Sequence, residues 1–174
     1  MPMEVAIFLI IVLVISAYTD IKSGIIPNVV TITSFVILLS YFYFTQGLEG
    51  LIFSIQGACV GFLVMMLPYL FGAMGAGDVK LMAALGAGLG PIHTFYAFLI
   101  TSILGGLYAL AVLLNYRGEL VHFLRRLGVW IVSWRITKSF DMTELRSDRL
   151  PSLRYGVAIA VGGTASVIHM LVEG

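Results

Sequence analysis

Long apolar runs dominate this sequence and limit the folds that are open to it. Hydrophobic residues make up 60% of the 174 residues and charged residues only 11%, whereas soluble domains carry roughly 25% charged residues. A run of about 20 apolar residues is long enough to cross a bilayer as a helix. The predicted spans are 3–19, 29–45, 51–72, 78–90, 94–115 and 155–172. We therefore expect an all-α polytopic membrane protein with about six transmembrane helices, forming a single domain over residues 1–174.

Two of these runs differ from an ordinary transmembrane span. The run 78–90 ends at Gly90-Pro91 and is too short to cross alone, so a tilted or thin span is expected there. The first run resembles a secretory signal in length. However, its leading residues include Glu4 and contain no lysine or arginine. A retained first helix is therefore expected.

The basic residues predict the orientation in the membrane. Lys22 and Lys80 account for two of the ten, and the other eight lie between Arg117 and Arg154. The connections on the opposite side hold Glu49 or His93 and no lysine or arginine. With six spans, the positive-inside rule places both termini outside and the two motifs with Lys22 and Lys80 at the cytoplasmic face of the inner membrane.

Two carboxylates are delivered to that face. Asp20 ends the first apolar run, and Asp78 follows the break Gly75-Ala76-Gly77. An ionisable residue costs about 2.5 to 3.5 kcal/mol at the centre of a membrane helix, so it indicates a functional site by default. Paired carboxylates can share one proton and activate water for peptide-bond cleavage. We therefore interpret Asp20 and Asp78 as the catalytic pair of an aspartic protease.

Each acid also has a purely structural interpretation. Asp20 could be a loop or capping residue before the breakers Ser23-Gly24, and Asp78 could cap the helix that follows it. Gly75 and Gly77 favour the catalytic interpretation, because residues without a Cβ let a substrate backbone approach and permit a positive φ beside the acid.

These motifs and their order resemble the type IV prepilin peptidases along essentially the whole chain. The resemblance implies that Asp20 and Asp78 are catalytic and that the protein cleaves the basic leader of prepilin or pseudopilin precursors after a glycine, at the cytoplasmic face. The expected partners are these precursors and membrane lipids, nucleic acid is not expected, and the oligomeric state stays open. The motifs that carry the resemblance are Asp20 with Lys22 and Pro27-Asn28, Gly75-Ala76-Gly77-Asp78-Val79-Lys80-Leu81, and Tyr155 to Ala160 with Gly162.

The sequence departs from the bifunctional members of that family, which carry an added region, often with a cysteine-ligated zinc, associated with N-methylation. Cys59 is the single cysteine here, so no cysteine pair exists to hold zinc. The chain therefore looks like the peptidase-only form found with tight-adherence (Flp-type) pili. Archaeal preflagellin peptidases share the Gly-x-Gly-Asp chemistry and remain an alternative.

Several further residues are expected to support the site. They are Gly75, Gly77, Lys80, Lys22, Pro27 and Asn28. Each lysine could stabilise the charged form of a neighbouring aspartate, or its ammonium group could reach the headgroup region. The expected mechanism has one aspartate as general base on a bound water and the other as the acid that protonates the scissile carbonyl.

No metal or other cofactor is expected. His93 is predicted on the outer side, His122 in an interfacial segment and His169 in the last span, so the sequence predicts no histidine cluster of metal-binding spacing.

The one long polar segment, 117–150, has an amphipathic pattern. Its apolar residues recur at spacings of four and three, with arginines between them. We interpret it as a cytoplasmic helix in the headgroup region, either a connector or a lid near the active site. The apolar residues are Leu120, Leu124, Leu127, Ile131 and Trp134.

An alternative from another class is a small transporter that binds a cation or proton at the two aspartates. Such proteins often contain an inverted pair of broken helices, and this sequence shows no evident pair. A noncatalytic scaffold would leave the two placed acids unexplained.

Overall fold

The computed structural model describes residues 1–70, 74–115 and 154–173, and all secondary structure within these ranges is helical. Each of the four elements is long and apolar enough to cross a membrane. The prediction of an all-α membrane protein is thus confirmed, whereas the amphipathic segment 117–150 lies outside the described residues. The elements are α1 (Met3–Ser23), α2 (Asn28–Leu70), α3 (Ala76–Asn115) and α5 (Tyr155–Glu173).

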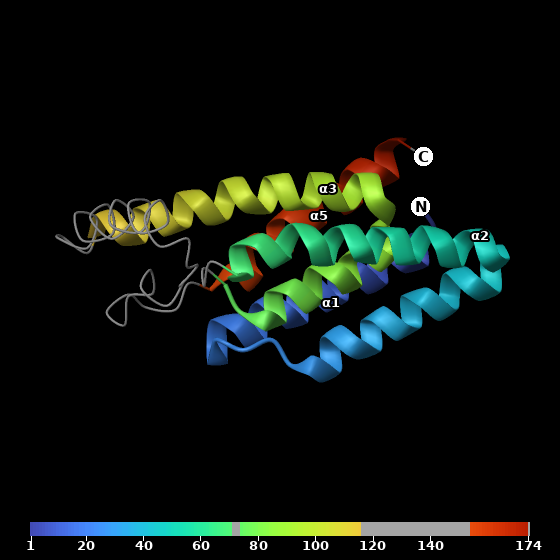
Figure 1. Cartoon of the computed structure of the whole chain (residues 1–174), viewed down its shortest axis with the longest axis horizontal. Helices are drawn as coiled ribbons and strands as arrows, with labels where there is room; N and C mark the ends of the chain where they lie inside the picture. Colours follow the sequence, from blue (N-terminus) through green and yellow to red (C-terminus); the bar gives the residue numbers. More distant parts are fainter. Residues whose placement is uncertain (71–73, 116–153, 174) are drawn as a thin grey trace, which may run out of the picture.

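Helices α2 and α3 each consist of two helical halves that meet at a glycine. A straight helix of the 43 residues of α2 would be about 65 Å long, roughly twice the hydrocarbon core of a bilayer. The chain instead reverses direction inside both elements (Figure 1). The turns fall at Gly47, with φ 65° and ψ −143°, and Gly90, with φ 72° and ψ 176°, backbone conformations that residues with a Cβ rarely adopt.

These reversals place the ends of the helices in two groups. Figure 1 shows the end of α1 and the starts of α2, α3 and α5 at one end of the molecule, while both termini and the reversals within α2 and α3 lie at the other. Residues far apart in the sequence therefore meet at each end.

Small residues let α2 and α3 approach at backbone distance. A Cβ added to Gly57 would collide with the carbonyl oxygen of Gly86, and one added to Gly86 would collide with that of Gly57. Nearby, the buried Ser54 hydroxyl donates to the carbonyl oxygen of Ala87 at 2.8 Å. Small residues thus permit close helix packing at this contact.

The outer surface of the bundle is apolar. Large aliphatic and aromatic side chains such as Ile7, Phe44 and Ile103 are more than half exposed, which suits contact with lipid chains rather than water. Buried apolar side chains fill the interior, among them Leu9 and Leu13 of α1 and Leu85 of α3.

Candidate active site

Asp20 lies on the inward face of α1. Leu9, Leu13, Ser16 and Asp20 are all buried, and their spacings of four, three and four place them on one side of a helix. The helix continues through Ser23 and ends where Gly24, in the left-handed region, donates its N–H to the Asp20 carbonyl at 2.8 Å. Only 5% of Asp20 is exposed, so its carboxyl group sits within the bundle rather than in a loop.

The carboxylate of Asp20 meets the start of α5. The backbone N–H of Gly156 donates to Asp20 Oδ2 at 2.9 Å in a buried position. First-turn N–H groups have no partner within their own helix, and the positive end of the helix dipole favours a carboxylate there. Helix α5 therefore holds one oxygen of Asp20 in place.

Close contact with Asp20 explains why residue 156 is a glycine. A Cβ at this position would lie 2.8 Å from Asp20 Oδ2 and 3.0 Å from Asp20 Cγ. These distances are shorter than real Cβ contacts, so any other residue would displace either α5 or the carboxylate.

Asp78 is the third residue of α3 and also caps it. Its Oδ2 accepts the N–H of Gly75 at 2.9 Å, while the N–H of Asp78 donates to the Gly75 carbonyl at 3.2 Å. This is half of a capping box, in which the third helical residue accepts the N–H of the N-cap residue, whereas the structural interpretation placed Asp78 itself at the N-cap. Asp78 is nevertheless only 6% exposed, so the cap directs a carboxylate into the bundle.

The fold brings the two carboxylates together. Asp20 and Asp78 lie within electrostatic range of each other, and Tyr155 at the start of α5 lies within the same range of Asp78. Arg154, exposed just before α5, is close enough to act electrostatically on Asp20. We call the group Asp20, Asp78 and Gly156 the aspartate end.

The backbone conformation of the two glycines before Asp78 differs from the expected one. Positive φ values occur at Gly24, Gly47 and Gly90 in the described part of the chain, so the prediction of a positive φ beside Asp78 is wrong. A Cβ on Gly77 would instead lie 3.1 Å from the side chain of buried Ile26. Gly77 thus permits close packing of the α1–α2 connection against the start of α3.

The other four supporting residues separate into two groups. Lys80 Nζ donates to Asn28 Oδ1 at 2.9 Å, and the carbonyl of Pro27 accepts the N–H of Val30 at 3.0 Å as α2 begins. The first contact joins the starts of α2 and α3, and the second lies within the start of α2. Lys22 instead lies 5.9 Å from the centre of the Tyr18 ring. Among the described residues, neither lysine forms an ion pair with an aspartate.

Sequence reasoning missed two polar neighbours of the aspartates. Ser16 lies one turn before Asp20, is fully buried, and its hydroxyl has no hydrogen-bond partner among the described residues. The sequence showed Gly156 only as a member of the motif from Tyr155 to Ala160, with no role for its N–H. Helical spacing from Asp20 was the available signal for Ser16, whereas nothing local indicated that Gly156 would contact Asp20.

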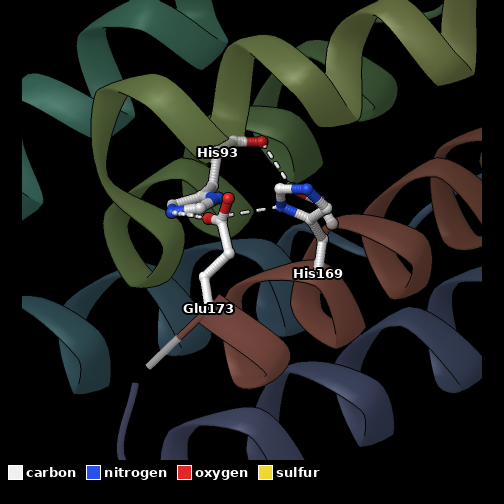
Figure 2. A network of polar contacts seen from close by, with 4 residues as sticks. His93, His169 and Glu173 are labelled. Atoms are coloured by element: carbon white, nitrogen blue, oxygen red, sulfur yellow. Dashed lines mark hydrogen bonds and ion pairs between the residues drawn. The ribbon is translucent and has the colours of Figure 1, made fainter.

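The prediction that the histidines form no cluster is wrong for two of them. His93, after the reversal in α3, and His169, near the end of α5, lie beside Glu173, as Figure 2 shows. They meet because the α3 reversal and the α5 terminus share one end of the bundle (Figure 1). His122 lies outside the described residues.

A helical membrane bundle with two buried carboxylates near one end is the class of protein that this fold and site define. The sequence profile of the type IV leader peptidase family matches residues 7–110, a range that includes both aspartates. The chain belongs to this family.

A curated relative supports the assignment. The chain is 33% identical over 114 residues to the prepilin leader peptidase/N-methyltransferase of Bacillus subtilis (strain 168). The aligned region covers 64% of this chain and 46% of that relative, so the chain spans about half the length of the protein it matches. No solved structure matches the chain.

Proposed function

We propose that this chain is a membrane aspartic endopeptidase that removes the basic leader from type IV prepilin-like precursors, with Asp20 and Asp78 as its catalytic residues. The observation that carries the proposal is that two buried carboxylates from different helices lie within electrostatic range of each other. Membership of the leader peptidase family supplies the substrate class.

The hydrogen bonds at the site suit acid–base chemistry. Oδ2 of Asp20 and Oδ2 of Asp78 each accept one backbone N–H. Among the described residues, the second oxygen of each carboxylate has no hydrogen-bond partner and is left for water or substrate. One carboxylate removes a proton from the attacking water, and the other, protonated, donates to the scissile carbonyl oxygen.

We propose six membrane crossings, with both termini outside and the aspartates near the cytoplasmic face of the inner membrane. The reversals at Gly47 and Gly90 divide α2 and α3 into halves that correspond to the predicted spans. Lys22 and Lys80 lie near the aspartates, in agreement with the positive-inside rule. Residues 1–174 would then form one membrane domain, with 117–150 at the cytoplasmic surface.

We further propose that this chain cleaves without methylating the product. Its single cysteine, Cys59, cannot form the cysteine-ligated zinc site that the resemblance associates with methyltransferase members.

The test is cleavage by the purified full-length chain in detergent micelles. A panel of precursors with intact leaders, from tight-adherence pilin, pseudopilin and preflagellin systems, is incubated with the protein and S-adenosylmethionine, and mass spectrometry identifies the new N-terminus. We expect a leader-free, unmethylated product from at least one pilin-type precursor. The matched control replaces both Asp20 and Asp78 with asparagine.

Four results would contradict parts of this proposal. Cleavage by the double asparagine variant would remove the aspartates from the mechanism. Failure of the folded wild-type protein on every precursor would leave the transporter interpretation favoured. A methylated product would refute the absence of a second activity, and preference for preflagellin would change the substrate class.

A further inference from the structure

A second group of ionisable side chains occupies the end of the bundle opposite the aspartates. His93 follows the reversal in α3, and His169 and Glu173 lie near the end of α5. Figure 1 shows that these parts of α3 and α5 lie at the end that holds both termini, away from the start of α5. We call His93, His169 and Glu173 the histidine end.

The three side chains point toward one another (Figure 2). Glu173 Oε2 lies 3.9 Å from His93 Nε2 and 3.4 Å from His169 Nδ1. One candidate ligand atom from each residue lies within 4.8 Å of the other two. One carboxylate oxygen and two imidazole nitrogens thus surround a common point.

These separations fit a tetrahedral metal ion. Ligands at about 2.0 to 2.1 Å from Zn²⁺ lie roughly 3.3 Å from one another in a tetrahedron. The two distances from Glu173, 3.4 and 3.9 Å, are near that value. The two imidazole nitrogens lie within 4.8 Å of each other, so binding would draw the two histidines toward the ion. Two imidazoles and one carboxylate favour zinc and neighbouring transition metals over Mg²⁺ and Ca²⁺, which prefer oxygen ligands. The fourth position would be left for water.

The surrounding contacts fix the spacing between the two helices. The Ser166 hydroxyl of α5 donates to the backbone carbonyl of His93 at 2.6 Å, which ties α5 to α3 one turn before His169. His169 and Glu173 are four residues apart on one helix, so they share a face. The Tyr96 ring lies 6.2 Å from the His93 ring and 5.9 Å from the His169 ring and packs against both imidazoles.

Exposure of the ligands sets the expected strength of binding. The His169 and Glu173 side chains are 55% and 57% exposed, so an ion from solution can reach them. His93 is 18% exposed, and its buried Nδ1 has no hydrogen-bond partner among the described residues. Because acceptors behind metal-ligating histidines strengthen binding, we expect weaker binding here than at a site where such an acceptor supports each histidine.

We propose that His93, His169 and Glu173 form a binding site for Zn²⁺ or a similar divalent transition metal, which clamps the end of α5 to α3. The site is separate from the proposed peptidase chemistry, since the other end of α5 contacts Asp20 through Gly156. A bound ion would restrain, from a distance, the helix that positions one of the aspartates.

The test measures metal binding directly. The full-length chain is purified without a polyhistidine tag, stripped with chelator, and titrated with ZnCl₂ alone by isothermal calorimetry, with metal content verified by atomic emission. We expect about one Zn²⁺ per chain and a higher melting temperature in zinc, because a ligand that binds the folded state stabilises it. MgCl₂ should produce neither effect.

Three variants identify the ligands. His169→Ala and Glu173→Gln change exposed side chains and should fold normally, and each should weaken zinc binding by roughly tenfold or more, within the range that perturbed metal sites show. His93→Gln should do the same. Two matched controls, Glu49→Gln, which removes an exposed carboxylate elsewhere, and His122→Asn, which removes the third histidine, should bind like the wild type.

The proposal fails if the wild type binds no zinc at 100-fold molar excess. It also fails if His169→Ala and Glu173→Gln keep wild-type affinity, since these side chains would then not be ligands of the ion. Loss of binding in His122→Asn, with wild-type affinity in the other three variants, would place the site elsewhere.

Discussion

The two ends of this helix bundle both gather ionisable side chains from different helices, but they hold them in different ways. At the aspartate end, both acids are buried and each accepts a backbone N–H. At the histidine end, His169 and Glu173 are more than half exposed and the side chains face one another. Backbone donors fix a carboxylate while leaving its second oxygen for chemistry, whereas facing side chains define a point where an ion can sit.

Helix α5 takes part in both ends of the bundle. Its first turn contacts Asp20 through Gly156, and its last turns carry His169 and Glu173. A single helix therefore connects the proposed catalytic site with the proposed metal site. Variants at the aspartate end should change cleavage far more than stability, and the following predictions test that difference from the largest effect to the smallest.

The largest effect is expected at the aspartates themselves. Asp20→Asn and Asp78→Asn should each lower the cleavage rate by roughly 10²–10⁴, because the shape is kept and the acid–base chemistry is lost. Steady-state cleavage of a precursor and detergent melting curves, measured on the same preparations, test this. Normal turnover by either variant would remove that residue from catalysis. Asp→Glu should also fail at one or both sites, since a displacement of about 1 Å can cost on the order of a hundredfold.

The next effect concerns the contact between α5 and Asp20. Gly156→Ala places a Cβ 2.8 Å from Asp20 Oδ2, so we expect the carboxylate to move and the rate to fall by about tenfold or more. Gly106→Ala is the matched control, because no heavy atom lies within 4 Å of its added Cβ. Alanine also favours the helix over glycine. If both variants cleave like the wild type, α5 does not position Asp20.

A smaller effect is expected at the glycine before Asp78. Gly77→Val adds a branched side chain against Ile26, only 3.1 Å from the added Cβ, whereas Ala76→Val changes an exposed residue. Gly77→Val should lower activity several-fold more than Ala76→Val. Because the contact is a packing contact, we expect its melting temperature to fall as well. An inactive variant with wild-type stability would instead indicate that Gly77 shapes the substrate path.

The smallest effect is expected for the contact between Lys80 and Asn28. Their hydrogen bond of 2.9 Å is exposed, and exposed charged contacts contribute about 1 kcal/mol or less to stability. Lys80→Met, Asn28→Ala and the double variant form a thermodynamic cycle, measured by thermal unfolding in detergent. Cleavage should change by less than about threefold. A large loss of activity with unchanged stability would assign Lys80 a direct role near substrate.

The membrane character and the helices of this chain could be read from local sequence. The apolar runs 3–19 and 155–172 match α1 and α5 within a few residues, and the break near Gly90-Pro91 falls at the observed reversal. Hydrophobic length and glycine or proline breaks act over one or two helical turns, so a single sequence contains them. The family resemblance could also be recognised from motifs, and the family match agrees with it.

Asp20 and Asp78 were identifiable as candidates because isolated acids at the edges of apolar runs are costly. The sequence suggested that Asp78 could cap the helix that follows it, because capping is a local contact. It could not show that Asp78 would also approach Asp20, because these residues lie far apart in the chain. The expectation of a positive φ near Asp78 was wrong for a similar reason. Gly77 responds to Ile26 from another part of the chain, which no local pattern contains.

Only the tertiary structure decided which distant residues meet. Gly156 reaches Asp20, and His93 reaches His169 and Glu173, because the reversals at Gly47 and Gly90 bring the helix ends into two groups. Hydropathy determined that these helices lie in a membrane, since burial of apolar length is a property of each segment alone. Contacts between segments depend on the packing of the whole bundle. They therefore depend on small residues such as Gly57 and Gly86, which allow two helices to touch.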